Sequence, residues 1–219
     1  MSRVLITGAS RGIGLALTKL FLERGDRVTA VCRQATAALK STSADIIESI
    51  DVTSAEDCQR LADEINYTVD ILINNAGLLE SETLGDMNFD TIRRQFEVNS
   101  IGPLQVTHVL LSKLQSGSKV IMITSRMGSM EDNGSGGYYG YRMSKAALNM
   151  AAKSLSIDLK HQEIPVVLLH PGYVQTDMTG KNGFMTPEES ASHLIRRIDD
   201  TSMTNTGTFK HAEGDALPW

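Results

Sequence analysis

The stretch Val4-Leu5-Ile6-Thr7-Gly8-Ala9-Ser10-Arg11-Gly12-Ile13-Gly14 decides the fold of this protein. Its first part, Val4–Thr7, is a short apolar run typical of a buried strand. The glycines at 8, 12 and 14 allow a tight turn and let the main chain approach a pyrophosphate. A helix that begins near Gly12 directs its free N–H groups at that negative charge. The spacing G-x-x-x-G-x-G is weak evidence alone, but its place between a first strand and an amphipathic helix predicts a dinucleotide-binding loop.

Strand-like and helix-like segments alternate from this loop to the end of the chain. Short apolar runs predict further strands at 27–32, 45–50, 69–74, 119–124, 166–170 and 207–210. Amphipathic spacing and capping residues predict helices that begin near 13, 54, 89, 139 and 186, the third running on to 114 and the fourth to 160. Repeated β-α-β units with apolar strands imply a parallel sheet covered on both faces and joined by right-handed crossovers. We therefore predict an α/β fold, one doubly wound Rossmann domain over residues 1–219, with about seven strands and a ligand site beyond their carboxyl ends.

The overall composition excludes several classes of function. A length of 219 residues allows a core that needs no disulfide or metal, and a formal net charge of -5 argues against a nucleic acid or a membrane as partner. Cys32 and Cys58 lie in dissimilar contexts and the five histidines are scattered, so no metal site is predicted. Neither a secretory signal nor an apolar run of roughly 20 residues occurs, so we expect a cytoplasmic protein with buried, reduced thiols.

The end of the second strand bears on which dinucleotide is bound. An acid at this point typically bonds the ribose 2′-OH of NAD, whereas NADP sites place an arginine nearby. The sequence here is Val31-Cys32-Arg33-Gln34, without an acid. Arg33 and Arg11 could converge on a 2′-phosphate, because the guanidinium fork matches that group. The sequence thus predicts NADP(H) in preference to NAD(H), the alternative being that Arg33 is a solvated surface charge.

One tyrosine has a lysine at helical spacing. A free phenol has a pKa of about 10, and a nearby ammonium favours its ionised form and brings it toward a useful range for proton transfer. Residues i and i+4 share a helix face, so Tyr141 and Lys145 are expected side by side. Tyr138 and Tyr139 reach Arg142 and Met143 instead, so the spacing selects Tyr141.

Several motifs follow one another in an order and at separations typical of a single family. They are Thr7-Gly8-x-x-x-Gly12-x-Gly14, Asn74-Asn75-Ala76-Gly77, Asn99, Ser125, Tyr141-x-x-x-Lys145 and Pro171-Gly172 with Thr176. On these motifs the chain resembles the short-chain dehydrogenase/reductase family along essentially its whole length. The stretches Ser125–Ser129 and Gly136–Arg142 are similar to the subgroup that holds the C-factor signalling protein and the sniffer-type carbonyl reductases.

The resemblance implies a role for each motif residue. Tyr141 would be the general acid/base, Ser125 would bond the substrate oxygen, and Lys145 would hold the nicotinamide ribose. Asn99 would support a water-linked proton route behind Lys145. The implied cofactor contacts are Gly8, Ser10, Arg11, Gly12, Ile13, Gly14, Arg33, Asp51, Val52, Asn75, Ala76, Gly77, Tyr141, Lys145, Pro171, Gly172, Val174 and Thr176. Simpler alternatives remain open: Ser125 as a strand terminus, Asn99 as a helix-kink residue and Asp51 as a turn former.

The substrate side departs from many family members. The segment from Ser125 to Tyr141 is longer and glycine-rich, and the segment between Thr176 and Thr186, which forms the lid in the family, is short. We therefore expect a comparatively open pocket. The residues available to line it, or to pack elsewhere, are Met127, Tyr173, Met178, Phe184 and Met185.

Two apolar stripes are expected on the helix that carries Tyr141. One comprises Leu148, Ala152, Leu155 and Leu159, and the other Met143, Ala146, Met150 and Ala151. A helix that is apolar on two sides must bury both, so one would face the sheet and the other a second copy of the chain in a homodimer or homotetramer. The terminal Trp219 is expected to dock near the site or on a neighbouring subunit.

These observations favour a reductase of small aldehydes or ketones that uses NADP(H) and Tyr141. One rival is a signalling or sensor protein of the C-factor type that binds the dinucleotide with little turnover. Retention of Ser125, Tyr141 and Lys145 weighs against it, because a pure binder has no chemical use for a correctly spaced acid. A second rival is a sugar-nucleotide epimerase or dehydratase, but those chains usually carry a further substrate domain for which this length leaves no residues.

Overall fold

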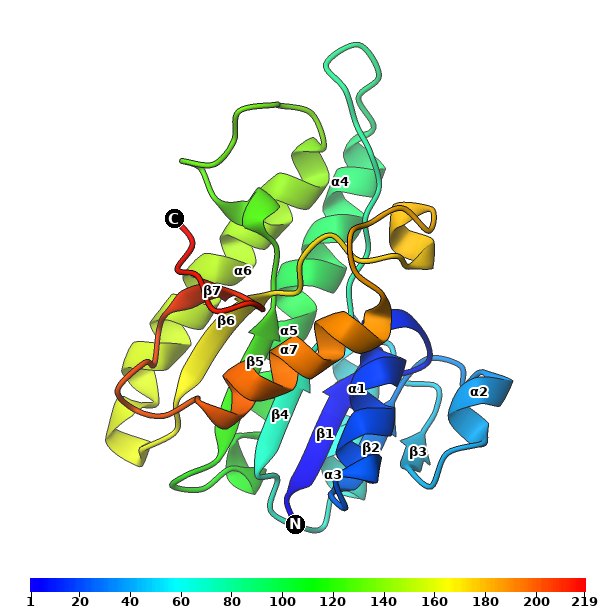
Figure 1. Cartoon of the computed structure of the whole chain (residues 1–219), viewed down its shortest axis with the longest axis vertical. Helices are drawn as coiled ribbons and strands as arrows, with labels where there is room; N and C mark the ends of the chain where they lie inside the picture. Colours follow the sequence, from blue (N-terminus) through cyan, green and yellow to red (C-terminus); the bar gives the residue numbers. More distant parts are fainter.

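Seven strands form one parallel sheet in the computed structural model, which describes residues 1–219. Along the sheet the order is β3-β2-β1-β4-β5-β6-β7, so the direction of winding reverses between β1 and β4 (Figure 1). This is the predicted doubly wound Rossmann fold. The strands are β1 (Arg3–Thr7), β2 (Arg27–Val31), β3 (Asp45–Ile47), β4 (Ile71–Asn74), β5 (Lys119–Ile123), β6 (Val166–His170) and β7 (Phe209–His211).

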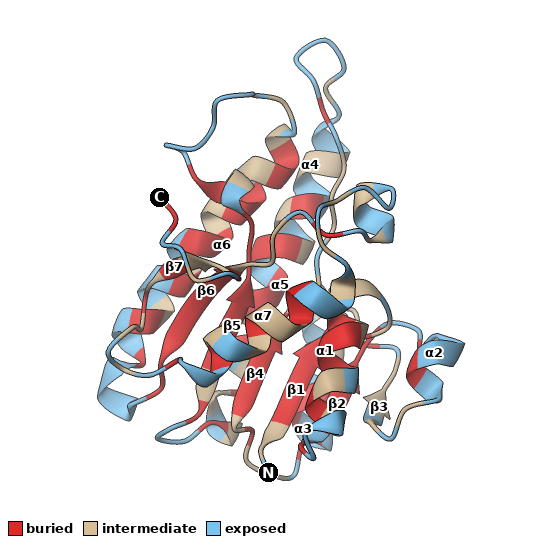
Figure 2. Ribbon diagram, in the orientation of Figure 1, coloured by how far each residue is buried: buried red, intermediate tan, exposed pale blue.

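Helices cover both faces of the sheet. They are α1 (Gly12–Glu23), α2 (Ala37–Lys40), α3 (Ala55–Glu64), α4 (Phe89–Phe96), α5 (Gly102–Val109), α6 (Tyr139–Asp158) and α7 (Pro187–Asp199). One buried cluster joins the sheet to α1 and α7, with Leu17, Phe21 and Leu194 at its centre. A second cluster joins the opposite face to α3, α5 and α6 through residues such as Val106 and Leu148. Burial is therefore continuous along β1, β4, β5 and β6, with exposed residues on the outer helix faces (Figure 2).

The predicted helix 89–114 is wrong as a single element. Helix α4 ends at Phe96, a π-helical turn spans Glu97–Ile101, α5 follows, and a 3-10 turn occupies Leu111–Lys113. Pro103 lies in the first turn of α5 and has no N–H to donate. Regular α-helical hydrogen bonding cannot continue through this point, and the wider π turn takes its place. The predicted strand 45–50 is also shorter, because the chain turns at Ser49, whose φ is 62°.

One predicted stripe of α6 is buried and the other faces outward. Leu148, Ala152 and Leu159 lie in the core against the sheet. Met143 and Met150 are exposed on the single chain, with Met150 68% exposed. Helix α6 thus presents apolar side chains that nothing within the chain covers.

The terminal tryptophan docks onto its own chain. The Trp219 ring lies 5.6 Å from the ring of Phe209 on β7, centroid to centroid. Its carbonyl oxygen accepts hydrogen bonds from the Ser129 hydroxyl at 3.2 Å and from the Glu131 N–H at 3.1 Å. The end of the chain is therefore tied to the segment that follows Ser125.

None of the helices has both the length and the apolar character needed to cross a membrane. Both cysteines are buried and free, as expected. Burial raises the pKa of the Cys32 and Cys58 thiols, which keeps them protonated.

Candidate active site

The sheet brings the predicted site residues together at one edge. The glycine loop follows β1, Asn75 follows β4, Ser125 follows β5 and Pro171 follows β6. Because all the strands are parallel, these four segments meet at the carboxyl ends, over the reversal between β1 and β4 (Figure 1). This is the position that the α/β pattern predicts for a ligand.

The glycine loop has the shape of a cradle for a phosphate group. A Cβ on Gly8, whose φ is 67°, would lie 2.8 Å from the Ala76 Cα, and a Cβ on Gly14 would lie 2.3 Å from the Gly8 carbonyl oxygen. The N-cap of α1 is Arg11, whose side chain makes no capping hydrogen bond. The first N–H groups of α1 therefore stay available to an anion. These residues fit the pyrophosphate of a dinucleotide.

Asn75 holds the loop in shape. Its side-chain amide donates to the carbonyl oxygens of Thr7 at 3.0 Å and Gly8 at 3.1 Å. The Thr7 hydroxyl oxygen in turn accepts from the N–H groups of Asn75 at 3.1 Å and Ala76 at 3.2 Å. The loops after β1 and β4 therefore form one unit. Gly77 follows on the β4 side, where an added Cβ would lie 3.8 Å from the Lys145 Nζ. Thr7 opens the glycine motif but was not predicted to be a site residue, because its place at the end of a strand indicates no role of its own.

The residues expected near the adenosine end are more dispersed. Arg33 is exposed, and Arg11 lies 3.6 Å from the carboxylate of Asp177 on the segment after β6. Asp51 accepts from the N–H and the hydroxyl of Thr53, at 3.0 and 2.8 Å, so it closes a turn. Val52 is buried against the position of Gly102. Asp51 therefore forms a turn, and its contact with the cofactor stays a prediction.

Two further contacts shape this end of the site. The Ser10 carbonyl accepts from the Thr36 hydroxyl at 2.7 Å, which ties the segment after β2 to the glycine loop. Ile13 lies in the first turn of α1 and packs against the core cluster on that face. The glycine loop is therefore anchored on the β2 side as well as on the β4 side.

The segment after β6 packs against the glycine loop. Gly172 has a φ of 89°, and a Cβ there would lie 2.5 Å from the Met185 Cε. Val174 is buried and pairs with Met185, while the Pro171 carbonyl accepts from the Ser190 hydroxyl at 2.7 Å. A Cβ on Gly12 would lie 3.3 Å from the methyl group of Thr176. The implied cofactor contacts after β6 are thus next to the phosphate cradle.

Among the predicted pocket residues, the apolar tips point outward. The rings of Tyr173 and Phe184 pack edge to face at 5.6 Å, and Phe184 is 89% exposed. Met178 is also exposed, whereas Met127 and Met185 are half-buried. Most of these side chains on the short segment are thus exposed, and the open pocket stays a prediction.

Ser125, Tyr141 and Lys145 are buried together where β5 meets α6. The Lys145 Nζ lies 5.8 Å from the centre of the Tyr141 ring and donates to the Ile123 carbonyl oxygen at 3.0 Å. A Cβ on Gly128 would lie 2.8 Å from the Lys145 carbonyl carbon, so a glycine lets the segment after Ser125 pack directly on α6. The helical spacing of tyrosine and lysine is confirmed, and the segment that carries the serine reaches the same helix.

Burial controls the protonation of this group. It raises the pKa of Tyr141 to about 12, and a hydrogen bond with Ser125 offsets only part of the rise. Burial also lowers the pKa of Lys145 to about 8. Burial is therefore the main influence on the pKa of Tyr141 in this structure, and the expected effect of Lys145 on its ionisation stays a prediction. Desolvation outweighs attraction here, because the lysine is bonded to Ile123 rather than to the phenol.

Asn99 lies in the π turn, and its side chain is fully engaged. Its Oδ1 accepts from the Leu78 N–H at 2.7 Å, and its Nδ2 donates to the Leu78 carbonyl at 2.7 Å and to the Ser144 hydroxyl at 2.9 Å. It thereby fastens the loop after β4 to the residue before Lys145. Asn99 thus lies at the break in the helix, as the helix-kink alternative expects, and its part in a water-linked proton route stays a prediction. Ser144 is a partner for which the sequence carries no signal.

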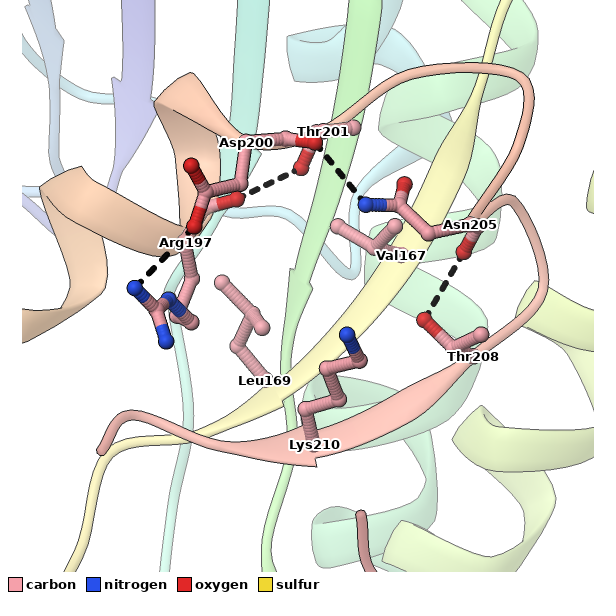
Figure 3. A pocket seen from close by; sticks show the side chains of 8 residues that line it. All are labelled: Val167, Leu169, Arg197, Asp200, Thr201, Asn205, Thr208 and Lys210. Carbon is pink, nitrogen blue, oxygen red and sulfur yellow. Dashed lines mark hydrogen bonds and ion pairs between the residues drawn. The ribbon is translucent and has the colours of Figure 1, made fainter. Parts of the chain in front are cut away.

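A small hollow between β6, β7 and the end of α7 lies away from this group (Figure 3). Its volume is about 30 Å³, which is room for one water molecule. The polar groups around it bind one another: Arg197 pairs with Asp200 at 3.0 Å, and the Thr208 hydroxyl donates to the Asn205 carbonyl at 2.7 Å. This hollow is too small to take a substrate.

A dinucleotide cradle beside a buried tyrosine, lysine and serine defines a dinucleotide-dependent oxidoreductase. Comparison with known proteins agrees: the profile of the family described as "short chain dehydrogenase" matches residues 2–185. The chain belongs to the short-chain dehydrogenase family.

Two relatives illustrate the range of the family. The 1-hydroxy-2-glutathionyl-2-methyl-3-butene dehydrogenase of Rhodococcus sp. (strain AD45) is 38% identical over 226 aligned positions, covering 100% of both chains. The C-signal of Myxococcus xanthus is 45% identical over 154 positions, covering 69% of this chain and 93% of the relative.

Solved structures support the fold and the subgroup. The carbonyl reductase Sniffer of D. melanogaster superposes with a TM-score of 0.93 at 30% identity, covering 100% of both chains. The NADPH-bound carbonyl reductase from chicken fatty liver has a TM-score of 0.91 at 28% identity, covering 100% of this chain and 99% of the other. The resemblance to the carbonyl reductase subgroup is thus confirmed.

Proposed function

We propose that this protein is an NADP(H)-dependent oxidoreductase that transfers hydride between the nicotinamide and the carbonyl or alcohol carbon of a small aldehyde or ketone. The observation that carries the proposal is the burial of Ser125, Tyr141 and Lys145 together, next to the phosphate cradle. A protein that only binds the dinucleotide has no chemical use for this group. Burying a lysine and a phenol costs stability, and such strongly perturbed groups are typical of functional sites.

Each residue has a part in the reduction. NADPH, when bound, supplies the hydride. Tyr141, with a pKa of about 12, holds its proton at neutral pH and donates it to the carbonyl oxygen as negative charge develops there. The Ser125 hydroxyl beside the phenol donates a hydrogen bond to the same oxygen. Lys145 is largely charged at neutral pH, with a pKa of about 8, and its ammonium favours the phenolate that is left after proton transfer.

The cofactor preference is inferred from the end of β2. The chain there reads Cys32-Arg33-Gln34, with no carboxylate to bond a ribose 2′-OH, and Arg33 is exposed and free to meet a 2′-phosphate. The reductase from chicken fatty liver, which shares the fold along its whole length, is an NADPH-bound protein. Arg11 serves the same phosphate if it leaves Asp177, with which it pairs at 3.6 Å.

The open substrate side allows a larger alcohol as the alternative substrate. The Rhodococcus relative is named as a dehydrogenase of a glutathionyl alcohol, and it aligns with the whole of this chain. The short lid, with Tyr173, Met178 and Phe184 exposed, leaves space for a bulky substituent. Oxidation of such an alcohol uses the same residues, with the Tyr141 phenolate as base.

A signalling role with little turnover is the alternative of a different class. It is favoured by the 45% identity to the C-signal of Myxococcus xanthus. The second α6 stripe, with Met143 and Met150 exposed, supports a homodimer or homotetramer in either case.

The test is NADPH consumption over a panel of aldehydes, ketones and diketones, with wild type beside Tyr141→Phe. NADPH binding is followed for both proteins by nicotinamide fluorescence. Turnover in the wild type that the variant loses by at least a hundredfold, with binding retained, supports the enzyme and its acid together. Tight NADPH binding by both proteins with no turnover on any carbonyl or alcohol favours the signalling role instead.

A further inference from the structure

The helix that carries Tyr141 begins without a cap of its own. Tyr138 occupies the N-cap position of α6 with φ 51° and ψ 43°, and its side chain makes no capping bond. Two glycines with positive φ precede it, and the first turn contains no acid. The first N–H groups of an α-helix have no partner within the helix. Those of α6 therefore depend on acceptors from elsewhere in the chain.

Glu82, in the loop between β4 and α4, supplies two acceptors at this end of α6, one for the N-cap residue and one for the first turn. Its carboxylate accepts from the Gly140 N–H at 3.0 Å, and its main-chain carbonyl accepts from the Tyr138 N–H at 2.8 Å. The other carboxylate oxygen accepts from the Thr91 hydroxyl and the Gln95 amide, both at 2.7 Å. Glu82 is 1% exposed, and no cation pairs with it. A negative charge is favourable here because the helix N-terminus carries a partial positive charge.

Gly140 allows the contact to be this close. A Cβ at this position would lie 2.4 Å from the Gln95 Nε2 and 2.9 Å from the Ile92 Cα. The main chains of α4 and α6 therefore meet at the residue directly before Tyr141. Gln95 is also buried, and its amide oxygen accepts from the Glu80 N–H at 2.9 Å, so its orientation is determined.

We propose that Glu82 is a positioning residue for the reaction: its buried carboxylate holds the first turn of α6 through Gly140 and so sets where the Tyr141 hydroxyl lies. The kinetic part of this inference rests on the proposed function. Glu82 acts through the main chain and has no contact with the phenol itself. A misplacement of about 1 Å in a reacting group costs on the order of a hundredfold in rate, so a small shift of this turn is enough to affect turnover.

The variant Glu82→Gln tests the contact because one acceptor becomes a donor. If the amide N–H₂ of the new glutamine faces α6, two donors meet at the Gly140 N–H. If the amide is turned the other way, two donors meet at the Gln95 N–H₂. The double variant Glu82→Gln/Gln95→Glu restores the bonds that join position 82 to α6 and to position 95: the new amide donates to position 95 and accepts from Gly140. The new carboxylate at 95 keeps the bond from the Glu80 N–H, and the Thr91 hydroxyl turns to the Asn88 carbonyl, already at 2.9 Å. Glu80→Gln is the matched control, since the Glu80 carboxylate pairs with Arg94 and not with α6.

We expect Glu82→Gln to lower kcat at least tenfold, with the KM for NADPH changed less than twofold, and the double variant to return kcat to within fivefold of wild type. Glu80→Gln should stay within twofold. A Glu82→Gln variant with kcat within twofold of wild type overturns the proposal, and so does a loss that the double variant fails to restore. If Glu82→Gln does not fold, the double variant alone decides: near-normal kcat supports the proposal, and a folded protein more than tenfold slower overturns it.

Hydrogen exchange of the Gly140 amide separates this inference from the proposed function. If the wild type turns over no carbonyl or alcohol, the proposed function fails, while exchange still reports on the contact. Faster exchange at Gly140 in Glu82→Gln, restored in the double variant, supports the hold on α6. Unchanged exchange overturns it.

Discussion

Replacing Lys145 by methionine should stabilise the protein while it abolishes turnover. The folded-state pKa of this lysine is lowered from 10.5 to about 8 because the side chain is buried. At about 1.4 kcal/mol for each pH unit, this lowering corresponds to a cost of about 3 kcal/mol near neutral pH for burying the ammonium. Methionine fills a similar volume without a charge, but it leaves the Ile123 carbonyl without its donor, which costs about 1–2 kcal/mol. Lys145→Met should thus be about 1–2 kcal/mol more stable at pH 7.

The pH dependence distinguishes this cause from better packing. A lysine whose folded pKa is depressed destabilises the protein below the folded value, and the cost disappears as pH rises from about 8 toward 10.5. The free energy of unfolding of the wild type should therefore rise by about 2 kcal/mol between pH 7 and 9.5 as the cost of burying the Lys145 ammonium is lost. The variant has no charge at this position and should not show this rise. Tyr141 hardly contributes in this window, since its folded pKa is raised to about 12 and it loses stability only as pH passes above 10.

Urea denaturation without NADPH, at pH 7 and pH 9.5, measures both effects. Lys153→Met on the same helix is the control, because this side chain is exposed at the surface. The difference in free energy of unfolding between Lys153→Met and the wild type should be the same at the two pH values. A Lys145→Met protein that is less stable than wild type at pH 7, or whose advantage is independent of pH, refutes the reasoning.

Three other predictions concern the cofactor and the assembly. Gly14→Ala should weaken NADPH binding at least tenfold by titration, because the added Cβ lies 2.3 Å from the Gly8 carbonyl oxygen, whereas Gly85→Ala, with open space around it, should bind normally. Arg33→Ala should raise the KM for NADPH about tenfold and leave the KM for NADH unchanged. Equal effects on both KM values would contradict a contact between Arg33 and the 2′-phosphate. Met150→Asp should shift the protein from dimer or tetramer to monomer in light scattering, and a monomeric wild type contradicts the second stripe as an interface.

Much of the fold was predictable because it depends on residues close together in the chain. The period of apolar residues identified the seven strands and the faces of α1 and α6, and the glycines at 8, 12 and 14 identified the loop after β1. The break at Pro103 was present in the sequence but was outweighed by the long helical pattern around it. Strand order was not predictable, since local periodicity says nothing about which strands pair.

The candidate site, too, was predictable only where it depends on residues close together in the chain. The i, i+4 spacing determined by itself that Tyr141 and Lys145 share a helix face, and the glycine spacing determined that a phosphate fits after β1. Only the tertiary structure decided that Lys145 bonds to Ile123, that Asn99 is engaged with Leu78 and Ser144, and that Glu82 meets Gly140. Such contacts join residues up to about 58 positions apart, and burial of the charges they involve depends on every element packed around them. Spacing along one helix is a property of the sequence, but desolvation and long-range hydrogen bonding are properties of the packed chain.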